Sequence, residues 1–166
     1  MLGLTTLGTI HTAISLIALA AGFAALARHK EISNASRSGK VFVWGTVLSC
    51  LTGFGIFQHG GFGNPHILGI VTLVVMAVAL TAQYTAAFDR LSRYVRTIGY
   101  SLTLFFHFIP DTIETLTRLP VGAPYLSGPL DPKAQPILGF FFLLFLIGAT
   151  LQVLWLRATR IIGATP

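Results

Sequence analysis

The sequence predicts an all-α fold, a polytopic integral membrane bundle of five transmembrane helices that forms a single membrane domain over residues 1–166. Of the 166 residues, 54% are hydrophobic and only 10% are charged, and the mean hydropathy is +0.77. The apolar residues form long runs, which a soluble core of this size does not need. The basic residues lie almost entirely in alternate connections between these runs, a pattern that orients membrane proteins.

Five apolar runs have about the length of a membrane span, which is roughly 20 residues. We expect helices at about residues 4–27, 41–58, 66–88, 97–116 and 137–156. The fourth run is the least regular, because Pro110, Asp111 and Glu114 interrupt it. A four-span bundle, in which this fourth segment is partly re-entrant, is the alternative.

The basic residues predict the orientation of the bundle. Nine of the eleven lysines and arginines fall on one side of the predicted membrane: Arg28, Lys30, Arg37, Lys40, Arg90, Arg93, Arg96, Arg157 and Arg160. Basic residues in short loops stay in the cytoplasm. We therefore expect a plasma (inner) membrane protein with its amino terminus outside and its carboxyl terminus in the cytoplasm.

This topology also explains the net charge of +6. The predicted partners are membrane lipid and either another membrane protein or a second copy of the chain. Nucleic acid is not expected, because no basic stripe is interleaved with exposed aromatic residues.

Four of the five histidines fall toward the outer side instead: His11, His59, His66 and His107. At a rise of about 1.5 Å per residue, His11 stands roughly 25 Å and His107 roughly 16 Å above the inner ends of their helices. Asp111 and Glu114 follow His107 at i+4 and i+7, which places the three on one helix face. Such groups inside a membrane usually face the bundle interior and mark a path or a site.

Two kinds of cofactor chemistry suit these residues. Imidazoles from facing helices can be the axial ligands of haem b, drawn from His11, His59, His66 and His107. A zinc, iron or copper ion can instead be held near the outer surface by His11, His107, Asp111 and Glu114.

Plainer interpretations exist for most of the same residues. His59 and His66 flank a turn at the membrane interface, where histidine is common. Asp111 and Glu114 can simply begin a solvated outer loop. Cys50, Gln83 and Gln152 are expected to serve packing or interhelical hydrogen bonds.

The connection over residues 119–135 is long and contains four prolines. Proline lowers the entropy that is lost when a loop becomes ordered. We therefore expect this loop to be ordered and folded over the outer end of the bundle.

Residues 5–88 resemble a widespread bacterial family of predicted membrane proteins of unknown function. The resemblance rests on four short motifs: Ile10-His11-Thr12-Ala13, Ala20-Ala21-Gly22, Gly39-Lys40 and Pro65-His66-Ile67-Leu68-Gly69. Many members carry a further histidine near the position of Ala35, which this chain lacks. The resemblance implies a helical bundle and draws attention to His11 and His66, and it implies no activity.

Three functions follow as hypotheses. The first is a small membrane redox or metal protein, most simply a b-type haem electron carrier with its site in the outer leaflet. The second is a membrane-embedded metalloenzyme, for example a hydrolase. The third is a non-enzymatic accessory subunit or small transporter whose polar residues carry protons or bind a partner. Whether the protein is an enzyme is left open by the sequence.

Overall fold

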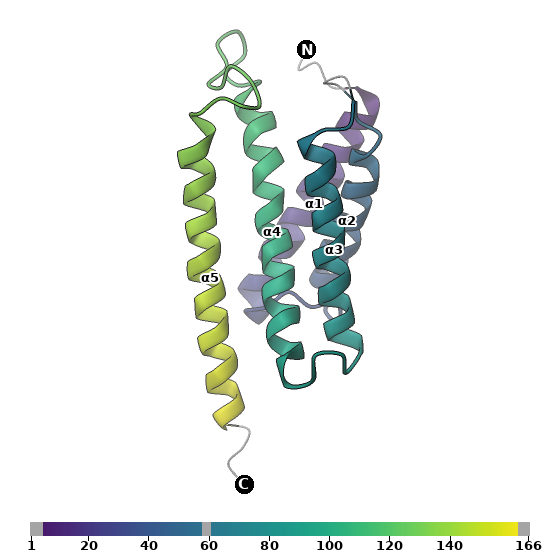
Figure 1. The fold of residues 1–166 in the computed structure, drawn as a ribbon, viewed down its shortest axis with the longest axis vertical. Helices are drawn as coiled ribbons and strands as arrows, with labels where there is room; N and C mark the ends of the chain where they lie inside the picture. Colours follow the sequence, from purple (N-terminus) through teal and green to yellow (C-terminus); the bar gives the residue numbers. More distant parts are fainter. Residues whose placement is uncertain (1–4, 58–60, 163–166) are drawn as a thin grey trace.

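The computed structural model describes residues 5–57 and 61–162, and the predicted all-helical fold is confirmed over these residues. The elements are α1 (Thr6–His29), α2 (Arg37–Gly53), α3 (Asn64–Tyr84), the short 3-10 helix η1 (Asp89–Leu91), α4 (Ser92–Leu116) and α5 (Ala134–Ile162). Figure 1 shows that successive α-helices run in opposite directions, so that the two termini lie at opposite ends of the longest axis.

The helix boundaries differ from the predicted ones where a capping side chain, rather than hydrophobicity, starts the helix. Ser36 Oγ accepts a hydrogen bond from the Gly39 amide at 3.0 Å, and α2 therefore begins at Arg37, before its apolar run. Likewise Thr5 caps α1 through the Gly8 amide at 3.0 Å. The largest difference at a helix end is in α5, which continues six residues past its predicted end at 156.

The fourth segment is one continuous helix. Pro110 lies inside α4, and the helix runs on to Leu116. The 25 residues of α4 would extend over roughly 38 Å.

Over the described residues, three helices are long and apolar enough to cross a membrane: α1, α3 and the Ala134–Thr159 part of α5. The other two fall short for different reasons. α2 has only 17 residues, and α4 is the most amphipathic of the five helices.

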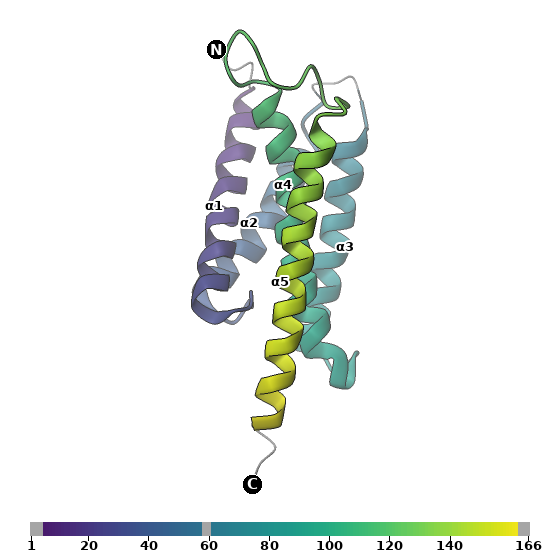
Figure 2. The ribbon, with the colours of Figure 1, turned by 90° about the vertical axis from the view of Figure 1, so that its left-hand side faces the viewer.

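The helices α1 to α4 form a four-helix core in which α1 packs on α2, α2 on α3, α3 on α4 and, more weakly, α4 on α1. Its centre is apolar and includes Phe42, Met76, Tyr100 and Leu104. The fifth helix, α5, lies outside this core and packs mainly on α4, as Figures 1 and 2 show from two directions.

We call the end with the connections 30–36 and 85–91 the basic end, and the end with the connection 117–133 the loop end (Figure 1). The connection 117–133 is anchored by hydrogen bonds. Leu126 is 1% exposed, and its amide donates to the Leu116 carbonyl of α4 at 3.0 Å. The Asp131 carboxylate accepts from the Ser127 amide at 2.8 Å and from the Lys133 amide at 3.0 Å.

Candidate functional site

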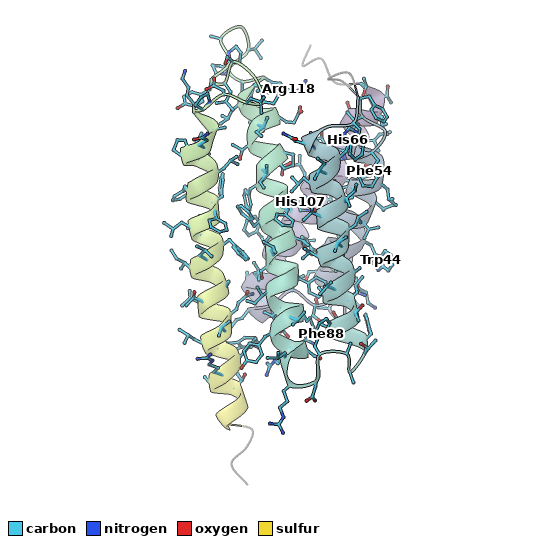
Figure 3. The ribbon with its side chains drawn as sticks, viewed as in Figure 1. Trp44, Phe54, His66, Phe88, His107 and Arg118 are labelled. Atoms are coloured by element: carbon cyan, nitrogen blue, oxygen red, sulfur yellow. The ribbon has the colours of Figure 1, made fainter. Side chains whose placement is uncertain are left out.

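His107 is a buried polar residue that joins three helices. It lies on α4, and its Nδ1 atom is 2.9 Å from Ser15 Oγ of α1. Its Nε2 atom is 3.0 Å from Thr46 Oγ1 of α2. A neutral imidazole has one N–H and one lone pair, so one hydroxyl accepts from the ring and the other donates to it. Along the longest axis His107 lies between His66 and Phe88 (Figure 3).

Close approach of α1 and α2 makes this arrangement possible. A Cβ atom added to Gly45 would lie 2.9 Å from the Cβ of Ala18, so only glycine allows the two backbones this near. Small residues at helix contacts have this effect in membrane bundles generally. Gly45 directly precedes Thr46, and the Phe42 ring packs against His107 with centroids 6.0 Å apart. The site is therefore held from several sides.

His11 lies one helical turn from Ser15 on the same face of α1, toward the loop end. Its Nδ1 is 2.9 Å from the Ser49 carbonyl oxygen and 3.2 Å from Thr52 Oγ1. A carbonyl oxygen only accepts, so Nδ1 carries the proton and donates. In the neutral ring the lone pair is then on Nε2, which makes no hydrogen bond within residues 5–57 and 61–162.

Asp111 and Glu114 have different surroundings, although both follow His107 on α4. Asp111 Oδ2 is buried and has no hydrogen-bond partner among the described residues. The exposed Glu114 instead accepts a hydrogen bond from Arg118 Nε at 2.9 Å and forms an ion pair with it. Of the two predicted carboxylates, only Asp111 turns toward the interior.

His66 is only 5% exposed, although an interfacial residue was one interpretation of it. The Gly63 amide donates to its Nδ1 at 3.2 Å, and in the neutral ring Nε2 therefore carries the proton. The ring stacks with Phe54, Phe57 and Phe62 at centroid distances of 6.5, 5.1 and 5.0 Å, and its buried Nε2 has no partner in the described part of the chain.

The predicted ligand sets are thus only partly brought together. His59 lies outside the described residues, so its place in a haem site is not defined. Within residues 5–57 and 61–162, no group of three or more His, Cys, Asp or Glu side chains is arranged to hold a metal ion. Coordination by His107 would require one of its two hydroxyl contacts to break, and Glu114 is engaged by Arg118.

A second polar cluster joins α4 to the connection between α1 and α2, near the basic end. The Glu31 carboxylate accepts from Arg96 Nη2 at 3.1 and 3.2 Å and from Thr97 Oγ1 at 2.9 Å. The side chains of Glu31 and Arg96 are 16% and 23% exposed. This carboxylate is therefore largely shielded from solvent and held by two groups of α4.

Gln83 of α3 joins the same region. Its Oε1 accepts from the Tyr100 hydroxyl at 2.8 Å and from the Asn34 amide at 3.1 Å. On the other side of α4, Gln152 of α5 accepts from Ser101 Oγ at 2.8 Å and donates to the Lys30 carbonyl at 3.0 Å. The prediction of hydrogen bonds between elements at both glutamines is confirmed.

Together these contacts define one polar stripe on α4. It begins with the adjacent pair Arg96 and Thr97 and then recurs every three or four residues at Tyr100, Thr103, His107 and Asp111. Thr97, Tyr100 and Thr103 are fully buried, and His107 is 7% exposed. The polar stripe extends from the basic end to the buried carboxylate of Asp111 near the loop end.

Several of these partners were not predicted from the sequence. Ser15 and Thr46 are hydroxyl residues inside apolar runs, where such residues are common and usually bond to their own helix backbone. Glu31 lies among the basic residues of a short connection. As an acidic residue next to Lys30 in an otherwise basic connection, Glu31 could have been predicted to pair with a basic residue.

A search of family models, curated proteins and solved structures finds no match to this chain.

Proposed function

We propose that this protein crosses the bilayer five times and conducts protons along the polar stripe of α4. The observation that supports this most directly is His107, held through both ring nitrogens by hydroxyl groups in an otherwise apolar setting. Polar and ionisable residues inside membranes are costly and often mark proton or ion paths. The proposal develops the third hypothesis from the sequence, a small transporter.

The directions of the helices support the proposal of five crossings. The helices α1, α3 and α5 are the three apolar candidates, and they run the same way along the longest axis (Figure 1). Three spans in one direction need two returns, and α2 and α4 provide them. The 17 residues of α2 measure roughly 26 Å, close to the hydrocarbon thickness of about 30 Å.

The orientation follows from the basic end, which we place in the cytoplasm. Single cysteines near Leu2 and after Gly163, in a Cys50→Ser background, test it on intact cells with a membrane-impermeant thiol reagent. We expect labelling at the amino terminus only. Labelling at both ends would require an even number of crossings and would contradict the proposal.

The chemistry of the stripe suits proton transfer. A neutral imidazole binds a proton at its lone-pair nitrogen and releases the proton of the other nitrogen, so that the ring ends neutral. Each neighbouring hydroxyl both donates and accepts. Ser15 and Thr46 can therefore deliver a proton to His107 and take one away without any change in net charge.

Successive members of the stripe are further apart than one hydrogen bond. Residues three or four apart on a helix have Cβ atoms about 5–6 Å apart. Water molecules or side-chain rotation must bridge these steps. In the proposed path Asp111 and His11 exchange protons at the loop end, and Glu31 does so at the basic end.

Proton flux into liposomes tests the proposal. The purified full chain is reconstituted with an internal pH-sensitive dye, and a potassium diffusion potential drives protons inward. We expect wild-type flux above that of protein-free liposomes. His107→Phe should abolish it, because the phenyl ring has no nitrogen, and Thr46→Val should reduce it strongly.

The matched control is Thr150→Val. Thr150 lies on α5, is exposed, and donates only to the Leu146 carbonyl of its own helix. Its flux should equal that of the wild type. Circular dichroism and gel filtration establish that every variant folds. Wild-type flux no faster than that of empty liposomes, or unchanged flux in folded His107→Phe, would overturn the proposal.

One observation favours the redox or metal hypothesis as a second candidate. The Nδ1–H···O=C bond of His11 leaves the lone pair of the neutral ring on Nε2, as a backbone carbonyl does for many metal-ligating histidines. A visible spectrum and a metal analysis of the detergent-purified protein test this candidate. Haem bands or stoichiometric metal that disappear in His11→Ala would support it; a colourless, metal-free protein would not.

A further inference from the structure

A recess of about 260 Å³ lies at the basic end, between the start of α4 and the last turns of α5. It is lined by Arg90, Arg93, Tyr94 and Leu156. This recess is separate from the polar stripe, and the function of the stripe does not depend on it. Two guanidinium groups, one phenol and one aliphatic side chain therefore share a small concave surface.

Both arginines of the recess are available to an anion. Arg90 and Arg93 are exposed, and neither forms an ion pair within the described residues. The nearby carboxylate of Glu31 is already occupied by Arg96. Among the described residues, no carboxylate lies within ion-pair distance of either guanidinium group, including that of the adjacent exposed Asp89.

Arg93 is also held in place. Its guanidinium carbon lies 5.3 Å from the centre of the Trp155 ring, and Nη1 donates to Thr159 Oγ1 at 3.3 Å. A cation over an indole face is attracted to the ring. Both contacts come from α5, so the two helices fix the position of this guanidinium group relative to Leu156.

We propose that this recess binds the headgroup of an anionic phospholipid. Arginine matches a phosphate group through paired hydrogen bonds. Tyr94 and Trp155 have the amphipathic rings that settle at headgroup depth. Basic recesses between helices on the cytoplasmic side are a recurrent form of anionic lipid site.

The apolar surface of α5 decides between a lipid and a free phosphate ion. Leu156 lies at the base of the recess and is almost fully buried, whereas Leu151, one turn from Trp155 on the same face of α5, is 61% exposed. An acyl chain that continues from the recess would lie along this surface, whereas a phosphate ion gains nothing from it. The chemistry therefore favours the lipid.

Native mass spectrometry of the full chain in mild detergent tests the site. Dioleoylphosphatidylglycerol and dioleoylphosphatidylcholine are added in equal amounts, and the bound lipids are counted for the wild type, Arg90→Gln, Arg93→Gln and Arg37→Gln. The exposed Arg37 begins α2 at the same end and does not line the recess, so its variant is the matched control.

We expect the wild type to prefer phosphatidylglycerol, and each recess variant to bind it about fivefold more weakly, since one basic residue near an anionic surface contributes on the order of 1 kcal/mol. Arg37→Gln and all phosphatidylcholine binding should be unchanged. An equal loss in Arg37→Gln would show general charge attraction and overturn the site. Displacement of phosphatidylglycerol by equimolar inorganic phosphate would overturn the choice of a lipid. Arg93→Lys, which keeps the charge, should lose less than Arg93→Gln; an equal loss would indicate a packing defect and count against the site.

Discussion

The neighbouring helices α4 and α5 have similar lengths and opposite environments. Seven of the thirteen phenylalanines lie on these two helices. Several of them form one seam, in which Phe108 stacks on Phe141 at 4.5 Å and Phe105 on Phe145 at 5.7 Å. Behind this seam α4 turns its polar stripe toward α1, α2 and α3. The outer side of α5 is a continuous exposed apolar surface, and only 6% of its spanning window is buried within the protein.

The difference shows how a small bundle can hold polar groups inside a membrane. Helix α4 is too polar to face lipid on every side, so three helices cover its stripe and α5 covers part of its apolar side. Helix α5 contributes little to the polar stripe and relies on lipid to cover its own surface. Specific packing should therefore matter in the four-helix core and much less on α5.

The largest effect is expected from filling the tightest contact of the core. Gly45→Leu places a side chain where a Cβ atom alone would approach Ala18 Cβ to 2.9 Å, which should separate α1 from α2. We expect a loss of about 3 kcal/mol, the upper part of the usual range for overpacking. Unfolding in mixed detergent micelles, followed by circular dichroism, measures it.

The control for this prediction is Gly148→Leu on α5. A Cβ atom at Gly148 meets no atom within 4 Å in the described structure, so the added leucine should project into lipid or detergent. Its stability should match that of the wild type. Equal losses at Gly45 and Gly148 would remove the proposed contrast between the four-helix core and α5.

The second largest effect is expected at one of two carboxylates that lie near opposite ends of the bundle. Glu31→Gln removes the charge that holds Arg96 and Thr97 at a largely shielded position, and should cost about 2 kcal/mol, as for hydrogen bonds to charged groups. Glu114→Gln removes an exposed i,i+4 ion pair with Arg118, and should cost about 0.5 kcal/mol or less. The same unfolding assay ranks them, and a larger loss at Glu114 would contradict the assignment of the shielded cluster.

Much of this fold follows from hydropathy alone. Long apolar runs predict the number and the approximate positions of the helices, and the alternation of basic connections predicts which ends lie together. The boundaries follow from other causes, because hydroxyl caps at Ser36 and Thr5 start helices where hydrophobicity gives no mark. Helix α4 also continues through Pro110, which a local helix-breaking rule does not predict.

The candidate site could be predicted only in part. Depth and helical spacing marked His107 and Asp111 as interior groups; in the structure His107 is buried, and Asp111 is half-buried with one buried carboxylate oxygen. The same spacing placed Glu114 beside them, but it cannot tell that Arg118, one turn further, draws Glu114 outward. Ser15 and Thr46 come from other helices, so their place around His107 depends on helix rotation, which spacing within one helix does not define.

A smaller effect is expected where the aromatic seam joins the two helices. Phe141→Ala removes the ring stacked on Phe108 and should lower the free energy of unfolding by about 1 kcal/mol, typical of an aromatic pair. Phe140→Ala, at the adjacent position with 57% exposure, should change it little. The same micelle assay compares the two variants. Indistinguishable variants would show that α5 is held to α4 by its ends and not by this seam.

The smallest effect concerns the connection that leads from α4 into α5. Hydrogen bonds from the Ser127 amide, the Lys133 amide and the Ser127 hydroxyl lower the pKa of Asp131 from 3.8 to about 2. A lowered pKa in the folded chain means that these bonds favour the ordered loop fully above a pH of about 4, and that this contribution is lost as the pH falls through about 2. Carboxyl carbon NMR of the protein in detergent should therefore give a midpoint near 2 for Asp131, while Asp131→Asn should leave the loop insensitive to pH in this window. A midpoint at the ordinary value of 3.8 would show that the loop does not hold this carboxylate in solution, and that α5 is tethered to the core more loosely than the hydrogen bonds of residues 127–133 indicate.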